Sequence, residues 1–156
     1  MAIGTATMTI TITESVDMND AAGGNTVGDT STSIAETITV NDIFKRIISV
    51  PTSEVTLYTS HASVVQGSVF DKDDVKFVRI TNLDGSNFVD LRITNENADE
   101  FVYRVYAGQS FILHSHVGSM NATQAAGAGL PNGDIVSVEA QANTAAVDLE
   151  IFVASA

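Results

Sequence analysis

Two histidines, His114 and His116, are the residues of this chain best spaced for chemistry. They stand one residue apart at the end of the apolar run "SFILHSH". Because side chains alternate between the two faces of a strand, both imidazoles would project to one side and could share a metal ion. A catalytic zinc normally has three protein ligands, and a facial iron triad has two histidines and a carboxylate. Asp134 and Glu139 are the carboxylates that would have to complete such a site.

The spacing Gly108-x5-His114-x-His116 resembles the start of the first motif of the cupins, a family of β-barrel metalloproteins. In that family a Glu follows the second histidine, and this chain has Met120 or Asn121 there. A further histidine follows a Pro-x-Gly turn in the family, and Val136 occupies that position here. Two of the four ligands implied by the resemblance are therefore present. We expect no bound metal and no cofactor, with both histidines facing solvent or a subunit contact.

Other chemical motifs are weak. Asp71, Asp73 and Asp74 cluster in "FDKDDV", and clustered oxygens suit calcium, but the glycine and terminal Glu of an EF-hand loop are missing. We expect a solvated acidic turn there. No G-x-S-x-G elbow, phosphate-binding loop or H-E-x-x-H motif occurs, so the sequence predicts a protein that is not an enzyme.

The amino-acid composition limits the classes of molecule that this protein is expected to bind. The 156 residues include 19 acids and 7 bases, a formal net charge of -12, and no cysteine. Such a charge repels phosphate backbones and anionic lipid, so we expect neither nucleic acid nor membrane as a partner. No secretion signal or membrane span is recognisable, and we expect synthesis in a cytoplasm.

The distribution of apolar residues predicts an all-β fold. Residues 8–13, "MTITIT", alternate as a strand does. Residues 14–36 are polar, and we expect an arm or a long excursion that is ordered only if a partner orders it. From residue 37 short strand-like runs recur about every 8–12 residues, typical of a sandwich or barrel. Residues 40–47 have the spacing of one short helix, and Asp84-Gly85 indicates a hairpin turn.

We therefore predict an N-terminal strand and polar arm over residues 1–36 and an antiparallel, jelly-roll-like β-sandwich over residues 37–156. The predicted core comprises Val55, Leu57, Phe77, Ile80, Val89, Leu91, Ile93, Val105, Phe111, Leu113, Val136, Val138, Leu149 and Ile151.

The C-terminal half resembles virion structural proteins of tailed bacteriophages. The resemblance lies in "VRITN", in "FVDLRITN", in the "AGQSF" turn at residues 107–111 and in the alternating strand at residues 145–153. It implies a head decoration, head–tail or tail component located in the virion. It also implies binding to the major capsid protein or another virion protein. The habits of that family imply a homotrimer.

Surplus apolar residues predict where subunits meet. Tyr103 and Tyr106 belong to "FVYRVY", whose two faces are both apolar, and Phe152 falls on the acidic face of the last strand. Met8, Ile10 and Ile12 form the N-terminal strand that we expect to pair with a neighbour. The alternatives are a cupin-like metalloprotein and a receptor- or carbohydrate-binding module, for which Tyr58, Tyr103 and Tyr106 would supply the platform.

Overall fold

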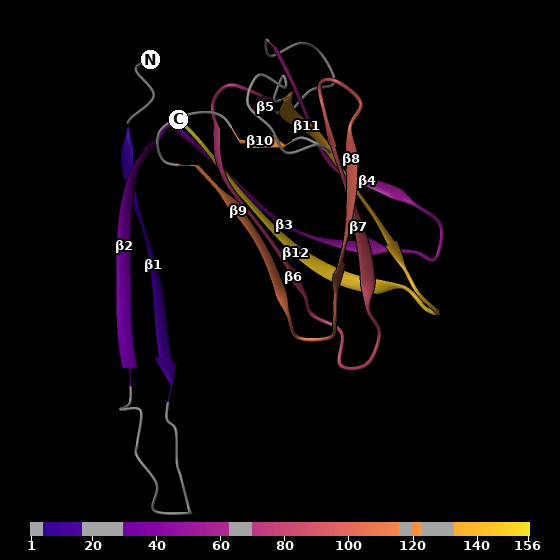
Figure 1. Cartoon of the computed structure of the whole chain (residues 1–156). Coiled ribbons are helices and arrows are strands. Elements are labelled where there is room, and N and C mark those ends of the chain that lie inside the picture. Colours follow the sequence, from indigo (N-terminus) through magenta and orange to yellow (C-terminus); the bar gives the residue numbers. More distant parts are fainter. Residues whose placement is uncertain (1–4, 17–29, 63–69, 116–119, 123–132) are drawn as a thin grey trace, which may run out of the picture.

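The structure is a computed structural model that describes residues 5–16, 30–62, 70–115, 120–122 and 133–156 (Figure 1). All regular structure in these ranges is β-strand, and no helix capable of crossing a membrane occurs in them. The strands are β1 (Ala6–Val16), β2 (Thr30–Val40), β3 (Asp42–Val50), β4 (Val55–His61), β5 (Phe70–Asp71), β6 (Val75–Asn82), β7 (Val89–Asn95), β8 (Glu100–Val105), β9 (Ser110–His114), β10 (Asn121–Ala122), β11 (Gly133–Ala142) and β12 (Val147–Ser155).

Two sheets form a β-sandwich, as predicted. One has the strand order β3-β12-β6-β9, and the other has the order β5-β4-β11-β7-β8 with β10 beside β11. Pairing is antiparallel throughout both sheets except between β4 and β5. Strands distant in sequence are thus neighbours, such as β3 and β12.

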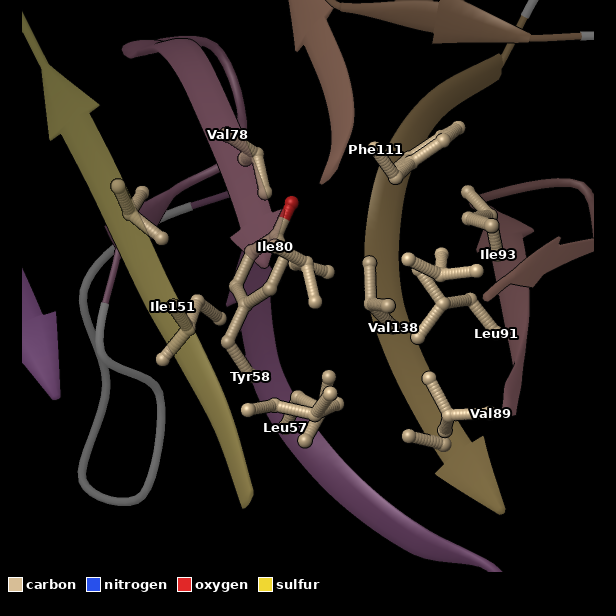
Figure 2. Packing of buried hydrophobic residues seen from close by; sticks show 14 of the residues in the cluster. Leu57, Tyr58, Val78, Ile80, Val89, Leu91, Ile93, Phe111, Val138 and Ile151 are labelled. Atoms are coloured by element: carbon tan, nitrogen blue, oxygen red, sulfur yellow. The ribbon is translucent and has the colours of Figure 1, made fainter. Parts of the chain in front are cut away.

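The core lies between the two sheets. Ile80 and Ile151 of one sheet are fully buried, as are Leu91 and Val138 of the other, and Figure 2 shows these side chains in one packed layer. Burying each such side chain contributes roughly 1.5–3 kcal/mol to folding, because its apolar surface leaves water. Tyr58 is also buried there, and burial raises the pKa of its hydroxyl.

Most of the predicted core residues are buried in the main core. Val55 and Leu113 are half-buried and pack against it, and two further residues differ for informative reasons. Val136 is half-buried, and Ile135 is buried in its place, because a β-bulge between Ile135 and Ser137 shifts the alternation of β11 by one residue. Phe77 is buried on the outer side of its sheet instead, in a second cluster.

The predicted short helix at residues 40–47 is wrong. Val40 ends β2, and the rest of the segment belongs to β3 after a bend at Asn41. Both faces of β3 carry apolar residues: Phe44 packs against the main core, whereas Ile43 and Ile47 are exposed on the other side. Apolar residues on both faces reproduce the three- and four-residue spacing of a helix.

The N-terminal segment forms a two-stranded antiparallel ribbon, β1 paired with β2 from Ala6↔Val40 to Val16↔Thr30. We call it the ribbon; it runs along one side of the sandwich (Figure 1). The expectation that residues 14–36 need a partner to be ordered is wrong for their described parts, because Glu14 lies in β1 and Thr32 lies in β2, and these strands pair with each other. Pairing with the opposite strand satisfies the backbone of these polar residues.

Candidate assembly surfaces

His114 connects the ribbon to the sandwich. It lies in β9 beside Phe77 of β6, and its Nδ1 is 3.3 Å from Oε2 of Glu36 in the ribbon. This contact is an ion pair when the imidazole is protonated. His116 lies outside the described residues, and no cluster of three or more metal-ligating side chains occurs within them.

The predicted acidic turn at residues 71–74 contains its own cation. The ammonium group of Lys72 lies 2.7 Å from Asp134, 3.0 Å from Glu96 and 3.3 Å from Asp73. Lys72 and Asp134 are largely buried, and the hydrogen bond to Asp134 is the first cause that raises the pKa of Lys72. The ammonium group of Lys72 thus supplies the positive charge that a metal ion bound by Asp73, Glu96 and Asp134 would otherwise supply.

The two carboxylates considered for a histidine metal site belong to separate clusters. Asp134 pairs with Lys72, whereas the nearest cation to Glu139 is Arg92, at 4.0 Å. The carboxylate that lies within 4 Å of His114 in the described structure is that of Glu36.

The ribbon packs on the outer face of the four-stranded sheet through the start of β1 and the end of β2, which we call its first half. Ile38, Val40, Phe77 and Ala154 are buried in this second cluster, and Met8, Ile10 and Phe152 are packed against it. Met8, Ile10 and Phe152, which the sequence predicted to lie between subunits, therefore pack against one cluster within a single chain. The phenyl rings of Phe77 and Phe152 meet edge to face at 5.8 Å.

The apolar face of the ribbon continues beyond this contact. Ile12 and Ile34 are cross-strand partners on the same face as Met8 and Ile38, and they are 45% and 57% exposed. The opposite face carries no charge and is exposed; it consists of Thr7, Thr9, Thr11, Thr13, Ser33, Ala35, Thr37 and Thr39.

A groove of about 280 Å³ opens between the ribbon and the sheet. Its lining residues are Met8, Thr9, Ile10, Lys45, Phe77, Arg79 and Phe152. Lys45 and Arg79 both bind the Glu150 carboxylate, at 3.0 and 2.5 Å, and the hydrogen bond from Lys45 leads the causes that lower the pKa of Glu150. The groove is therefore largely apolar, and the two cations in its lining share the carboxylate of Glu150.

The second candidate surface is the strand β8, which has a described neighbour, β7, on one side and ends its sheet on the other. Phe101, Val102 and Tyr103 are 38%, 64% and 48% exposed, although Phe101 and Tyr103 are opposite buried residues of β7. Tyr106, just after β8, is also exposed and lies 6.0 Å from Phe88. The sequence predicted Tyr103 and Tyr106 as interface residues. Val102, the most exposed of the set, was counted only among the apolar residues of this run.

The three tyrosines do not form one binding platform. Tyr58 is 3% exposed and faces the core, whereas Tyr103 packs on Phe111 at 5.0 Å and Tyr106 packs on Phe88. Gly108, the first residue of the cupin-like spacing, has φ of 71° in the turn between β8 and β9, a conformation that glycine adopts readily. Its position is explained by this turn.

Comparison with known proteins does not place the chain in a family: no protein-family model matches it, and neither the curated proteins nor the solved structures contain a match.

Proposed function

We propose that this protein is a structural component of a phage virion, a capsid decoration or cement protein that self-associates and attaches to the major capsid protein or another virion protein. The observation that carries the proposal is the ribbon. Its first half packs on the sandwich, and its second half presents Ile12 and Ile34 on the same apolar face, uncovered by the described residues.

A two-stranded ribbon has little stability of its own, because it has too few contacts to offset the entropy of ordering its chain. A ribbon that exposes two isoleucines on one face gains stability when a neighbouring protein covers them. The described ribbon contains two charged residues, Glu14 and Glu36, in a chain with a net charge of -12. Both lie on the same face as Ile12 and Ile34, and Glu36 is already in contact with His114. A partner that covers this face must therefore leave Glu14 in water or supply it with a cation.

The strand order supports the jelly-roll part of our fold prediction. Of the eight longer sandwich strands, the first and last are neighbours in one sheet, β3 and β12, and the second and second-last are neighbours in the other, β4 and β11. We infer jelly-roll connectivity from this nesting. Jelly rolls occur in viral capsid and lectin domains and in cupins, so the fold supports a capsid role only by analogy. The ribbon is the feature that favours assembly.

The experiment has two steps. Peptide mass spectrometry of purified particles from the phage that encodes the chain tests whether it belongs to the virion. Particles that lack the chain are then incubated with purified protein and sedimented. The wild-type chain should sediment with the particles, whereas Ile12→Thr/Ile34→Thr should lose at least roughly 10-fold in affinity, because two apolar contacts are removed.

A matched control uses the neighbouring cross-strand pair on the other face of the ribbon, Thr11 and Ala35. Thr11→Ala/Ala35→Ser should sediment as the wild type does. Absence of the chain from particles, or binding that survives the double isoleucine change, would refute the proposal.

A further inference from the structure

The backbone of β8 is arranged to accept another strand. The amide of Asn95 donates to the carbonyl of Asp99 at 3.0 Å where the β7–β8 ladder begins. Bonded and non-bonded pairs alternate along an antiparallel ladder. Phe101 and Tyr103 therefore direct their backbone groups at β7, and Glu100, Val102 and Arg104 direct theirs at the outer edge of the sheet.

The side chains on this edge are complementary to themselves. A two-fold axis through Val102, perpendicular to the sheet, places a second β8 antiparallel to the first. Val102 then lies opposite Val102 of the second copy. Glu100 lies opposite Arg104 on the same face, and Phe101 lies opposite Tyr103 on the other face. Each of these last two pairs occurs twice, as two-fold symmetry requires.

Other registers lose this match. Moving the axis by one residue to Tyr103 places Arg104 opposite Val102 and Glu100 opposite Tyr106. Moving it to Phe101 places Glu100 opposite Val102 and Arg104 opposite Ala98. Axes at Glu100 or Arg104 set like charges directly opposite each other, which is destabilising. Among registers that keep each face of the sheet continuous, the one centred on Val102 pairs both charges.

Both charged side chains are held in place by β7. Arg104 forms two hydrogen bonds to Asp90, at 2.7 and 2.9 Å, and its guanidinium lies 3.8 Å from the centre of the Phe88 ring. Glu100 accepts a hydrogen bond from Arg92 at 3.2 Å. Across the proposed contact, the charges on this face alternate from Asp90 and Arg104 of one copy to Glu100 and Arg92 of the other.

We propose that β8 pairs with β8 of a second copy of this chain about a two-fold axis at Val102, joining two sheets into one continuous sheet. The contact covers Phe101, Val102 and Tyr103, satisfies the outward backbone groups of an edge strand and pairs four charges. It is a property of the purified chain and stands apart from attachment to a particle. It predicts a dimer, where resemblance to phage proteins implies a trimer.

The test is light scattering of the intact chain across micromolar concentrations, with Val102→Lys as the disrupting variant. The wild type should have twice the mass of one chain. Val102→Lys places two ammonium groups opposite each other and should raise the dimer dissociation constant by roughly 10-fold or more. Val102 is 64% exposed, so its replacement leaves the fold of each chain intact.

Ile47 provides the matched control. It is 60% exposed and β-branched, and it lies on β3, the end strand of the other sheet. Ile47→Lys should remain a dimer with an unchanged dissociation constant.

Cross-linking tests the register, because the chain has no cysteine of its own. Directly opposite residues in a bonded pair have Cα atoms about 5.5 Å apart, within the range for a disulfide. Val102→Cys should therefore form a covalent dimer under mild oxidation, and Ile47→Cys should not. A monomeric or trimeric wild type, a dimer unaffected by Val102→Lys, or equal cross-linking of both cysteine variants would overturn the proposal. None of these outcomes depends on whether the chain is found in virions, so pairing through β8 and attachment to the particle are tested separately.

Discussion

Replacing Phe77 by Ala should release the ribbon and leave the sandwich folded. Phe77 is 7% exposed, and it is buried on the outer side of its sheet by the ribbon residues Ile38 and Val40. It belongs to the second cluster and is separate from the main core. Removing the ring therefore weakens the contact between ribbon and sheet and spares the packing between the two sheets.

The magnitude follows from the size of that contact. Truncating a buried Phe to Ala costs about 3–5 kcal/mol, and we expect the lower end, about 3 kcal/mol, because the cluster is small. Burial of Ile38, Val40 and Phe77 contributes roughly 5–9 kcal/mol at 1.5–3 kcal/mol for each side chain. Ordering costs of about 1–2 kcal/mol for each residue offset much of this. A loss of 3 kcal/mol is therefore a large part of the net free energy of docking.

Hydrogen exchange resolves the two parts of the molecule. A loss of 3 kcal/mol corresponds to roughly 100-fold faster exchange, at 1.4 kcal/mol for each factor of ten. We expect this acceleration for the paired amides of β1 and β2, with β7 and β11 nearly unchanged. Ile47→Ala, an exposed change on the outer face of the same sheet, serves as the control. Uniform acceleration of ribbon and sandwich amides would refute the reasoning, since both would then unfold as one unit.

Three further predictions concern polar side chains. Lys72→Met should lower the free energy of unfolding by about 2–3 kcal/mol at neutral pH, measured in urea, because the largely buried Asp134 loses its counter-charge. The folded-state pKa of Lys72 is raised above its ordinary value of 10.5, so this difference should be complete below that pH and shrink as pH rises further; a difference that persists in strong alkali would contradict it. Tyr58→Phe should stabilise the protein by about 1 kcal/mol in the same assay, since the buried hydroxyl has no hydrogen-bond partner in the described residues; a clear loss of stability would reveal a partner. Elemental analysis should find no stoichiometric transition metal, and His114→Ala/His116→Ala should change stability by less than about 1 kcal/mol; bound metal that the double variant loses would support the cupin-like alternative.

The β-sandwich could be predicted from the sequence because the period-2 alternation of apolar residues is a local property. Leu91, Ile93, Leu149 and Ile151 are buried as their positions in alternating runs predict. The same locality explains the errors. Apolar residues on both faces of β3 imitate a helix, and a bulge moves burial from Val136 to Ile135, and neither effect is visible in a short window of sequence.

The turn at Asp84-Gly85 also separates what local sequence determines from what strand pairing determines. Asp84 accepts hydrogen bonds from the amides of Ser86 and Asn87, both at 2.7 Å, so the expected turn is present. The expected hairpin is not, because β6 and β7 belong to different sheets. Local residues determine that the chain reverses, and the long-range pairing of each strand determines which sheet it joins.

The candidate surfaces could be predicted from the sequence less well than the fold, because they depend on tertiary structure. The sequence marked Tyr103 as surplus apolar surface, but only the strand order makes β8 the end of its sheet and exposes Val102. Likewise Glu36 meets His114, and Lys72 meets Asp134, across separations that no local pattern encodes. Composition and periodicity decide which residues avoid water. Which strand stays at an edge, and which charge finds a partner, is decided by the free energy of the whole set of strand pairings.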